Sequence, residues 1–231
     1  MSVPRDTRDK LFDEWPDRYD AWFQTPIGAL VKRYESAMLR ELLLPCQGET
    51  ILDAGCGTGV FTLDLLSFGP HIIGLEISRP MLKRAGQKAI GFAFHPITGD
   101  MMALPFADGV FDKTVSMTAL EFVEDAYGAV SELFRVTKKG GTIVVTTLNS
   151  LSPWATRRQQ KAEKGHHLFR KMIFRSPDEM RAMVSVDTVV KTAIHFQKDE
   201  DPVKVPEIER QGQKRNLDTG AFLAVRWIKP S

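Results

Sequence analysis

The chain has 231 residues, with 31 lysines and arginines against 29 aspartates and glutamates, 43% hydrophobic residues and two cysteines. That length suits one globular α/β domain, and a net charge of +2 is too small for a dedicated nucleic-acid-binding protein. No apolar run approaches the ~20 residues that span a bilayer, and the start MSVPRDTRDKLF lacks the hydrophobic stretch of an export signal. Cys46 and Cys56 form no metal-binding or disulfide pattern. We expect a cytoplasmic protein without a transmembrane segment or a bound metal.

The first two thirds of the chain alternate amphipathic helices with short apolar strands. Apolar residues recur at helical spacing from Ile27 to Leu42, and Pro45 ends this first helix. Strands are predicted at 50–54, 71–77, 92–98, 111–118 and 142–148, with helices at 61–68, from the N-cap Ser78 to Lys88, and from the N-cap Asp125 to Lys138-Lys139-Gly140-Gly141. Nearly continuous apolar strands between helices indicate a parallel sheet covered on both faces, so the predicted fold is a doubly wound α/β sandwich.

The pattern changes beyond Asn149. A polar, basic stretch comes first. It is followed by a helix at 177–184 opened by Ser176, a strand at 188–196, a polar segment at 197–219 and strand-like residues at 220–227.

The turn after the first strand is rich in glycine. Gly55, Gly57 and Gly59 give the spacing GxGxG, whereas the third glycine of GxGxxG would fall at Val60. Asp53 places a carboxylate at the end of the strand, where it would repel a pyrophosphate and attract a cationic ligand that carries an amino group. The turn therefore favours such a ligand over a dinucleotide.

Two further acids follow predicted strands. Glu76 stands where a carboxylate can accept both hydrogens of a ribose diol, and Asp100 can accept from an adenine amine. Met101 offers a backbone amide to the same ring, and Ile77 and Met101 are suitable apolar walls for it. One ligand that contacts three strand ends is the simplest interpretation.

The ordered motifs LDAGCGTG, GLEIS, GDMMALPF, FDKTVSMTALEFVED and LFRVTKKGGTIVVTTLN resemble the class I S-adenosylmethionine-dependent methyltransferases, in the type 11 branch that includes ubiquinone and menaquinone C-methyltransferases. The resemblance covers roughly residues 12–149. It implies a Rossmann-like sheet of seven strands, mostly parallel with an antiparallel C-terminal strand, and an N-terminal helical lid. It further implies an N-terminal cap at 1–45, a cofactor-binding core at 46–149, a substrate-side insert at 150–185 and a C-terminal strand pair at 186–231.

The resemblance also implies a cofactor, S-adenosylmethionine, with S-adenosylhomocysteine as its product. The methionine moiety would meet Asp53 and the loop backbone, the ribose Glu76, the adenine Asp100 and Met101, and the sulfonium Met117 and Thr118. Tyr19 resembles the tyrosine of an N-terminal lid, although its aromatic neighbours also suit plain packing. The expected cofactor contacts are Tyr19, Asp53, Gly55, Cys56, Gly57, Glu76, Ile77, Met81, Asp100, Met101, Met117 and Thr118.

The residues on the acceptor side are less defined. Family members often carry His in the segment after the fourth strand where this chain has Glu121, which is either an acid facing the acceptor or a solvated residue. Trp154 suits an acceptor wall or the core. The basic stretch 157–171 suits a solvated helix face, an anionic substrate or a lipid, and His166 and His167 would act as bases only if it folds inward. The candidates for the acceptor side are Trp22, Glu121, Trp154 and Arg158, and those for catalysis are Tyr19 and Glu121.

The predicted function is methyl transfer to a small-molecule acceptor by in-line displacement at the sulfonium. The chain has no Asn/Asp-Pro-Pro-aromatic motif, which argues against nucleobase amines and glutamine amides as acceptors. Two alternatives stay open: a non-catalytic module that binds or regulates a partner, and a nucleotide-dependent oxidoreductase.

Overall fold

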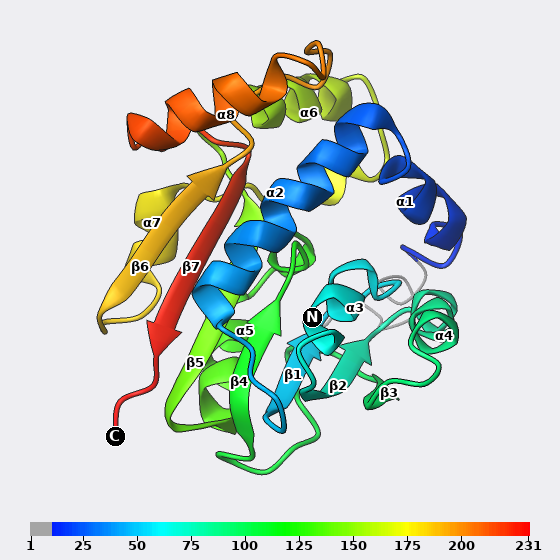
Figure 1. The fold of residues 1–231 in the computed structure, drawn as a ribbon, viewed down its shortest axis with the longest axis vertical. Helices are drawn as coiled ribbons and strands as arrows, with labels where there is room; N and C mark the ends of the chain where they lie inside the picture. Colours follow the sequence, from blue (N-terminus) through cyan, green and yellow to red (C-terminus); the bar gives the residue numbers. More distant parts are fainter. Residues whose placement is uncertain (1–10) are drawn as a thin grey trace.

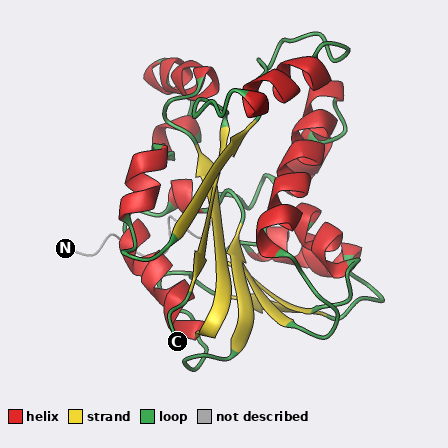
Figure 2. Ribbon diagram, turned by 60° about the vertical axis from the view of Figure 1, so that its left-hand side comes forward, coloured by secondary structure: helices red, strands yellow, loops and turns green. Residues whose placement is uncertain are grey.

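A computed structural model describes residues 11–231, which form one seven-stranded sheet with helices on both faces (Figure 2). The expectation that the chain starts without an export signal falls mainly on residues outside this range. In the sheet order β3-β2-β1-β4-β5-β7-β6, the first five strands of the sequence run parallel and β7 is antiparallel to both neighbours. The predicted fold class is therefore confirmed. The strands are β1 (Thr50–Ala54), β2 (His71–Glu76), β3 (Phe94–Thr98), β4 (Phe111–Ser116), β5 (Thr137–Leu148), β6 (Thr188–Ala193) and β7 (Phe222–Ile228).

The helices begin largely where polar caps and prolines place them. Ser78 and Asp125 accept hydrogen bonds from backbone N–H groups of the first turn, and Ser176 forms a capping box with Glu179, so all three predicted caps are confirmed. The helices are α1 (Pro16–Trp22), α2 (Pro26–Leu43), α3 (Val60–Leu66), α4 (Arg79–Lys88), α5 (Ala126–Val136), α6 (Pro153–Glu163), α7 (Pro177–Ala182) and α8 (Val205–Lys214), with short 3-10 turns η2 (Leu120–Phe122) and η3 (Phe169–Lys171).

Each face of the sheet carries its own hydrophobic core. Leu39 and Leu65, from α2 and α3, belong to the core on one face, and Leu133 and Met180, from α5 and α7, belong to the core on the other. In Figure 1, α2 runs diagonally across the sheet, and α6 and α8 lie beyond its upper edge. Within residues 11–231, no helix is long and apolar enough to cross a membrane.

Several predicted boundaries are wrong. The helix predicted to continue to Gly140-Gly141 ends at Val136, because residues 137–141 already belong to β5 and Thr137 pairs with Phe111 of β4. Phe68 lies past the end of α3 and is 40% exposed.

The segment at 197–219 is not irregular throughout, since it contains α8, whose few buried positions are scattered among charged residues. His195 lies beyond the end of β6 rather than in a strand, and its backbone N–H donates to Glu209 Oε2 (2.8 Å). In both cases the local apolar pattern was too weak to mark the boundary.

Candidate active site

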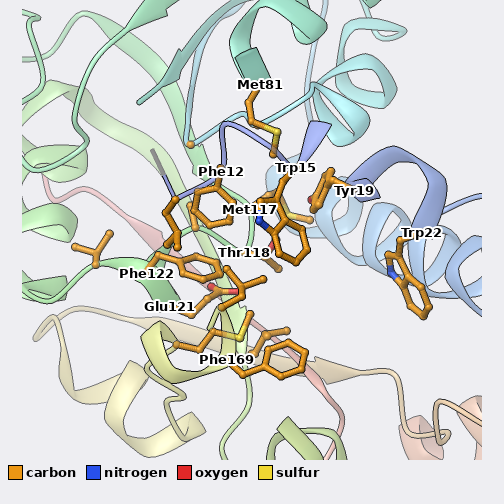
Figure 3. Close-up of a pocket in the computed structure, with 18 of the residues that line it drawn as sticks. Phe12, Trp15, Tyr19, Trp22, Met81, Met117, Thr118, Glu121, Phe122 and Phe169 are labelled. Carbon is orange, nitrogen blue, oxygen red and sulfur yellow. The ribbon is translucent and has the colours of Figure 1, made fainter. Parts of the chain in front are cut away.

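A cavity of about 520 Å³ lies at the carboxyl ends of the parallel strands. Its floor comes from the loops that follow β1 to β4 and from the end of β5, and its roof comes from the N-terminal segment with α1 and from α6 and η3. Figure 3 shows Met117, Thr118 and Glu121 on the floor, with Trp15 and Tyr19 of the N-terminal segment and Phe169 of η3 around them. The strand order reverses between β1 and β4, which is where open parallel sheets bind ligands.

The backbone of the glycine-rich loop has positive φ angles, a conformation that residues other than glycine adopt only with strain. Gly55 and Gly57 have φ angles of +82° and +55°, and a Cβ atom on Gly55 would lie 2.5 Å from the Cβ of Ala119. Both glycines line the cavity, so bound atoms can approach their backbone. The Gly57 N–H donates to Glu76 Oε2 (3.0 Å), which ties the loop to the end of β2.

The three acids predicted at strand ends have different surroundings. Glu76 lines the cavity, and its other oxygen accepts from the Ser78 N–H (2.9 Å), while burial raises the pKa of this carboxyl. Asp100 also lines the cavity, where it accepts from the Met102 N–H (2.9 Å). The cavity thus presents two of these carboxyl groups.

The third acid, Asp53, lies behind the glycine-rich loop and does not line the cavity. It accepts from Thr62 Oγ1 (2.6 Å), its Oδ1 atom is buried with no hydrogen-bond partner among residues 11–231, and burial raises its pKa to about 6. Part of its hydrogen-bonding capacity is therefore unused.

A set of polar contacts fastens α1 over the cavity. Asp20 Oδ1 accepts from Thr58 Oγ1 (2.6 Å), in the glycine-rich loop, and pairs with Lys88 Nζ of α4 (2.6 Å). Asp20 Oδ2 pairs with Arg84 (3.4 Å). Tyr19, the neighbouring residue, lines the cavity and packs edge-on against Phe23 at a centroid distance of 5.2 Å. Tyr19 is thus both a cavity wall and part of the packing that holds α1.

The half of the cavity away from Glu76 holds a group of buried charged side chains. Glu121 and Glu35 both line it, and burial raises their pKa values to about 7 and about 8. The guanidinium of Arg158 lies near both: its charge lowers their pKa values, and burial lowers its own. Apart from these groups, this half is lined mainly by apolar and aromatic side chains, among them Trp22, Trp154, Phe169, Met172 and Phe222.

Comparison with known proteins identifies a known domain within the chain. Residues 52–145 match the family profile described as a methyltransferase domain. This match and the curated relatives support the resemblance to the class I S-adenosylmethionine-dependent methyltransferases of the type 11 branch. The motifs that carried the resemblance, from the glycine-rich loop to β5, lie within or close to the matched region.

Two curated relatives match part of this chain and part of their own length. The chain is 38% identical over 104 residues to a malonyl-[acyl-carrier protein] O-methyltransferase of Erwinia billingiae, a match that covers 45% of this chain and 41% of the relative. It is 33% identical over 145 residues to a demethylmenaquinone methyltransferase of Beutenbergia cavernae, with 63% of this chain and 59% of the relative covered. The chain thus spans about two fifths to three fifths of the length of these relatives.

A solved structure supports the fold along nearly the whole chain. A SAM-dependent methyltransferase of Thermotoga maritima, described as a possible histamine N-methyltransferase, aligns with a TM-score of 0.70 and 22% identity over 96% of this chain and 99% of that one. At that identity the comparison concerns the fold alone.

The residues around the methyltransferase domain's cavity fit the family's cofactor. The carboxyl of Glu76 lines the cavity and Gly55 leaves the loop backbone open, while behind that loop Asp53 keeps an oxygen, Oδ1, with no hydrogen-bond partner among the described residues. Of the other predicted cofactor contacts, Cys56 has a buried side chain that does not line the cavity. The rest do line it: Tyr19, Gly57, Ile77, Met81, Asp100, Met101, Met117 and Thr118.

The predicted acceptor-side residues converge on the other half. Trp22, Glu121, Trp154 and Arg158 all line the cavity, and Trp154 Nε1–H also donates to Phe196 O (2.6 Å), so this tryptophan serves both wall and core. In the basic stretch, His166 and His167 are both exposed; His166 lines the cavity and His167 does not. Within residues 11–231, no cluster of His, Cys, Asp and Glu side chains suits a metal ion.

Sequence reasoning missed Glu35 and Lys198, which also line the cavity. Glu35 carried a signal: it follows Val31 by four residues on the apolar stripe of α2, where an acid is out of place. Lys198 follows β6 in a polar loop, and nothing in its local sequence distinguishes it from a solvated lysine.

Proposed function

We propose that this chain transfers a methyl group from S-adenosylmethionine to a small-molecule acceptor that binds in the same cavity. The observation that carries the proposal is the division of one continuous cavity into two halves. One half has the glycine-rich loop, Glu76 and Asp100, and the other has aromatic walls around Glu121 and Arg158. When bound, the cofactor supplies an electrophilic methyl group on its sulfonium.

On the cofactor side, the chain's residues bind S-adenosylmethionine and orient it. Glu76 holds the ribose hydroxyls, Asp100 and the Met101 backbone hold the adenine, and the loop backbone, with Asp53 behind it, holds the amino-acid end. Met117 and Thr118 lie between the two halves, at the end of β4, where the reacting group belongs. Thr118 is fixed there by a hydrogen bond from its N–H to Thr146 Oγ1 (3.0 Å).

On the acceptor side, aromatic walls exclude water and position the acceptor against the methyl donor. Glu121 is the candidate general base, because a carboxyl with a pKa of about 7 is matched to accept a proton at neutral pH from a hydroxyl or an acidic carbon. Burial raises the pKa of Tyr19, so its phenol stays neutral and acts as a hydrogen-bonding wall. The two relatives' names specify different acceptors, a malonyl-acyl carrier protein and demethylmenaquinone, so neither is transferred to this chain.

Calorimetric titration with S-adenosylhomocysteine tests the cofactor half. We expect binding tighter than about 1 mM, weakened by Asp53→Ala and by Glu76→Ala. Transfer of a labelled methyl group to the small-molecule fraction of a cell extract tests the reaction. Tight cofactor binding with persistent absence of transfer would support the non-catalytic alternative instead.

A further inference from the structure

Arg158 is a charged residue of the acceptor half whose hydrogen-bonding capacity is partly unused. It lines the cavity, and its Nη1 atom is buried with no hydrogen-bond partner among the described residues. Glu35 and Glu121 act on it through space, and it forms no ion pair within residues 11–231. A buried guanidinium that lacks a partner carries a large desolvation cost unless a ligand supplies the missing anion.

Aromatic rings lie against two of the cations of this wall. The Arg158 guanidinium lies over the ring of Trp154 (5.2 Å to the centroid), and Lys198 Nζ lies over the ring of Trp22 (4.8 Å). The two rings pack edge to face with their centroids 6.5 Å apart. A cation held on an aromatic face keeps its positive charge available for an incoming anion.

Further positive charge lies along the same wall. Arg157 and Lys161 of α6 line the cavity as well, and their charges, with that of Arg158, help to lower the pKa of Lys198. Arg157 is paired with Asp199 (3.0 Å), while Lys161 forms no ion pair within the described part of the chain. The wall therefore attracts an anion that enters from solvent.

The two acids beside Arg158 do not cancel this attraction at neutral pH. Burial raises the pKa of Glu35 to about 8 and that of Glu121 to about 7, so both groups carry less negative charge at neutral pH than exposed glutamates do. A protonated carboxyl donates a hydrogen bond, and a carboxylate ligand accepts one. The same half of the cavity is otherwise aromatic and apolar, which suits an organic acid better than inorganic phosphate.

We propose that the methyl acceptor carries a carboxylate group and that Arg158, seated on Trp154, binds it. This inference rests on the proposed function, since it assigns the class of acceptor for the same cavity. Arg158 then determines specificity: its planar guanidinium matches the two oxygens of a carboxylate, and an uncharged or cationic acceptor would leave it without a partner.

The test uses matched probes with the full chain saturated by S-adenosylhomocysteine at pH 6.5. We expect 3-phenylpropanoate, measured by calorimetry, to bind about tenfold or more tightly than its amide, 3-phenylpropanamide, or its amine, 3-phenylpropylamine. Arg158→Gln should remove the preference for the acid and leave amide binding within about twofold, whereas Arg158→Lys should keep part of it. Arg170→Gln is the matched control, because Arg170 is exposed in the same insert and does not line the cavity.

The outcomes separate the two proposals. If the wild-type chain does not bind S-adenosylhomocysteine, the proposed function is refuted. Intact cofactor binding with equal affinity for acid, amide and amine, with preference for the amine, or with no acid binding at about 10 mM, overturns the carboxylate inference alone. Preference for the acid that survives Arg158→Gln overturns the role of Arg158. The wild-type comparison needs no variant, so it decides the inference even where a substitution prevents folding.

Discussion

Asp20 fastens α1 over the cavity, so its removal should weaken cofactor binding more than it weakens the fold. Asp20→Ala deletes the acceptor of the Thr58 hydrogen bond and leaves Lys88 and Arg84 without their partly buried partner. Hydrogen bonds to charged groups contribute about 1.5–3 kcal/mol each, and exposed ion pairs much less, so partial exposure of this cluster suggests a total of about 1–2 kcal/mol. If closure of α1 accompanies binding, the Kd for S-adenosylhomocysteine should rise about 5- to 30-fold.

The assay is calorimetric titration of wild type, Asp20→Ala and the control Asp17→Ala. Asp17 lies on the same helix and pairs with the same Arg84, but its side chain is 86% exposed, so its loss should change the Kd less than about twofold. Since no side chain of α1 is fully shielded from solvent and Tyr19 is only half-buried by exposed area, we expect the melting temperature of the ligand-free protein to fall only by about 2 °C or less. Equal Kd values for wild type and Asp20→Ala would refute the lid interpretation.

Three other predictions test the site and its charges. Glu76→Gln places an amide NH₂ against a backbone N–H donor and should raise the Kd for S-adenosylhomocysteine by about tenfold or more, and an unchanged Kd would contradict its role. Gly55→Ala drives a Cβ to 2.5 Å from that of Ala119 and should abolish binding and lower the melting temperature, whereas Gly48→Ala, with a similar φ of +80° but open space, should only strain the backbone by about 1 kcal/mol. Between the ordinary pKa of 4.5 and the raised value of about 8, Glu35 makes the folded state bind more protons than the unfolded state, so the ligand-free protein should lose stability as pH rises through that window. Melting curves of Glu35→Gln should show a shallower fall, and a melting point that climbs with pH would contradict the assignment.

The sequence alone predicted most of the sheet and the cofactor half of the cavity. An apolar strand followed by the glycine-rich loop is a local pattern, and Glu76 and Asp100 are read directly from their places after strands. Because parallel strands end at one edge of a sheet, residues after β1, β2 and β3 meet there whatever the side-chain packing elsewhere. The boundaries failed where tertiary pairing overrode local preference, as at Thr137, which joins β5 through its pairing with β4 although it follows directly on a helix.

The sequence named Glu121 and Arg158 as acceptor-side candidates, but their grouping with Glu35 and Lys198 was decided by the tertiary structure. Glu35 comes from α2, Glu121 from η2, Arg158 from α6 and Lys198 from a loop after β6, and no local spacing relates these four elements. Their meeting depends on how helices pack across the ends of the strands, which sets the direction of each side chain and the burial that raises the pKa values of both acids. The near-neutral composition, a net +2 over 231 residues, therefore conceals a cavity with Glu76 and Asp100 on the cofactor side and, on the acceptor side, Arg158 and Lys161 without an ion pair among the described residues. The apolar periodicity along the chain determines which residues follow the strands at the carboxyl edge of the sheet. The charge balance within the cavity depends on burial, which arises only when distant segments pack together and exclude water.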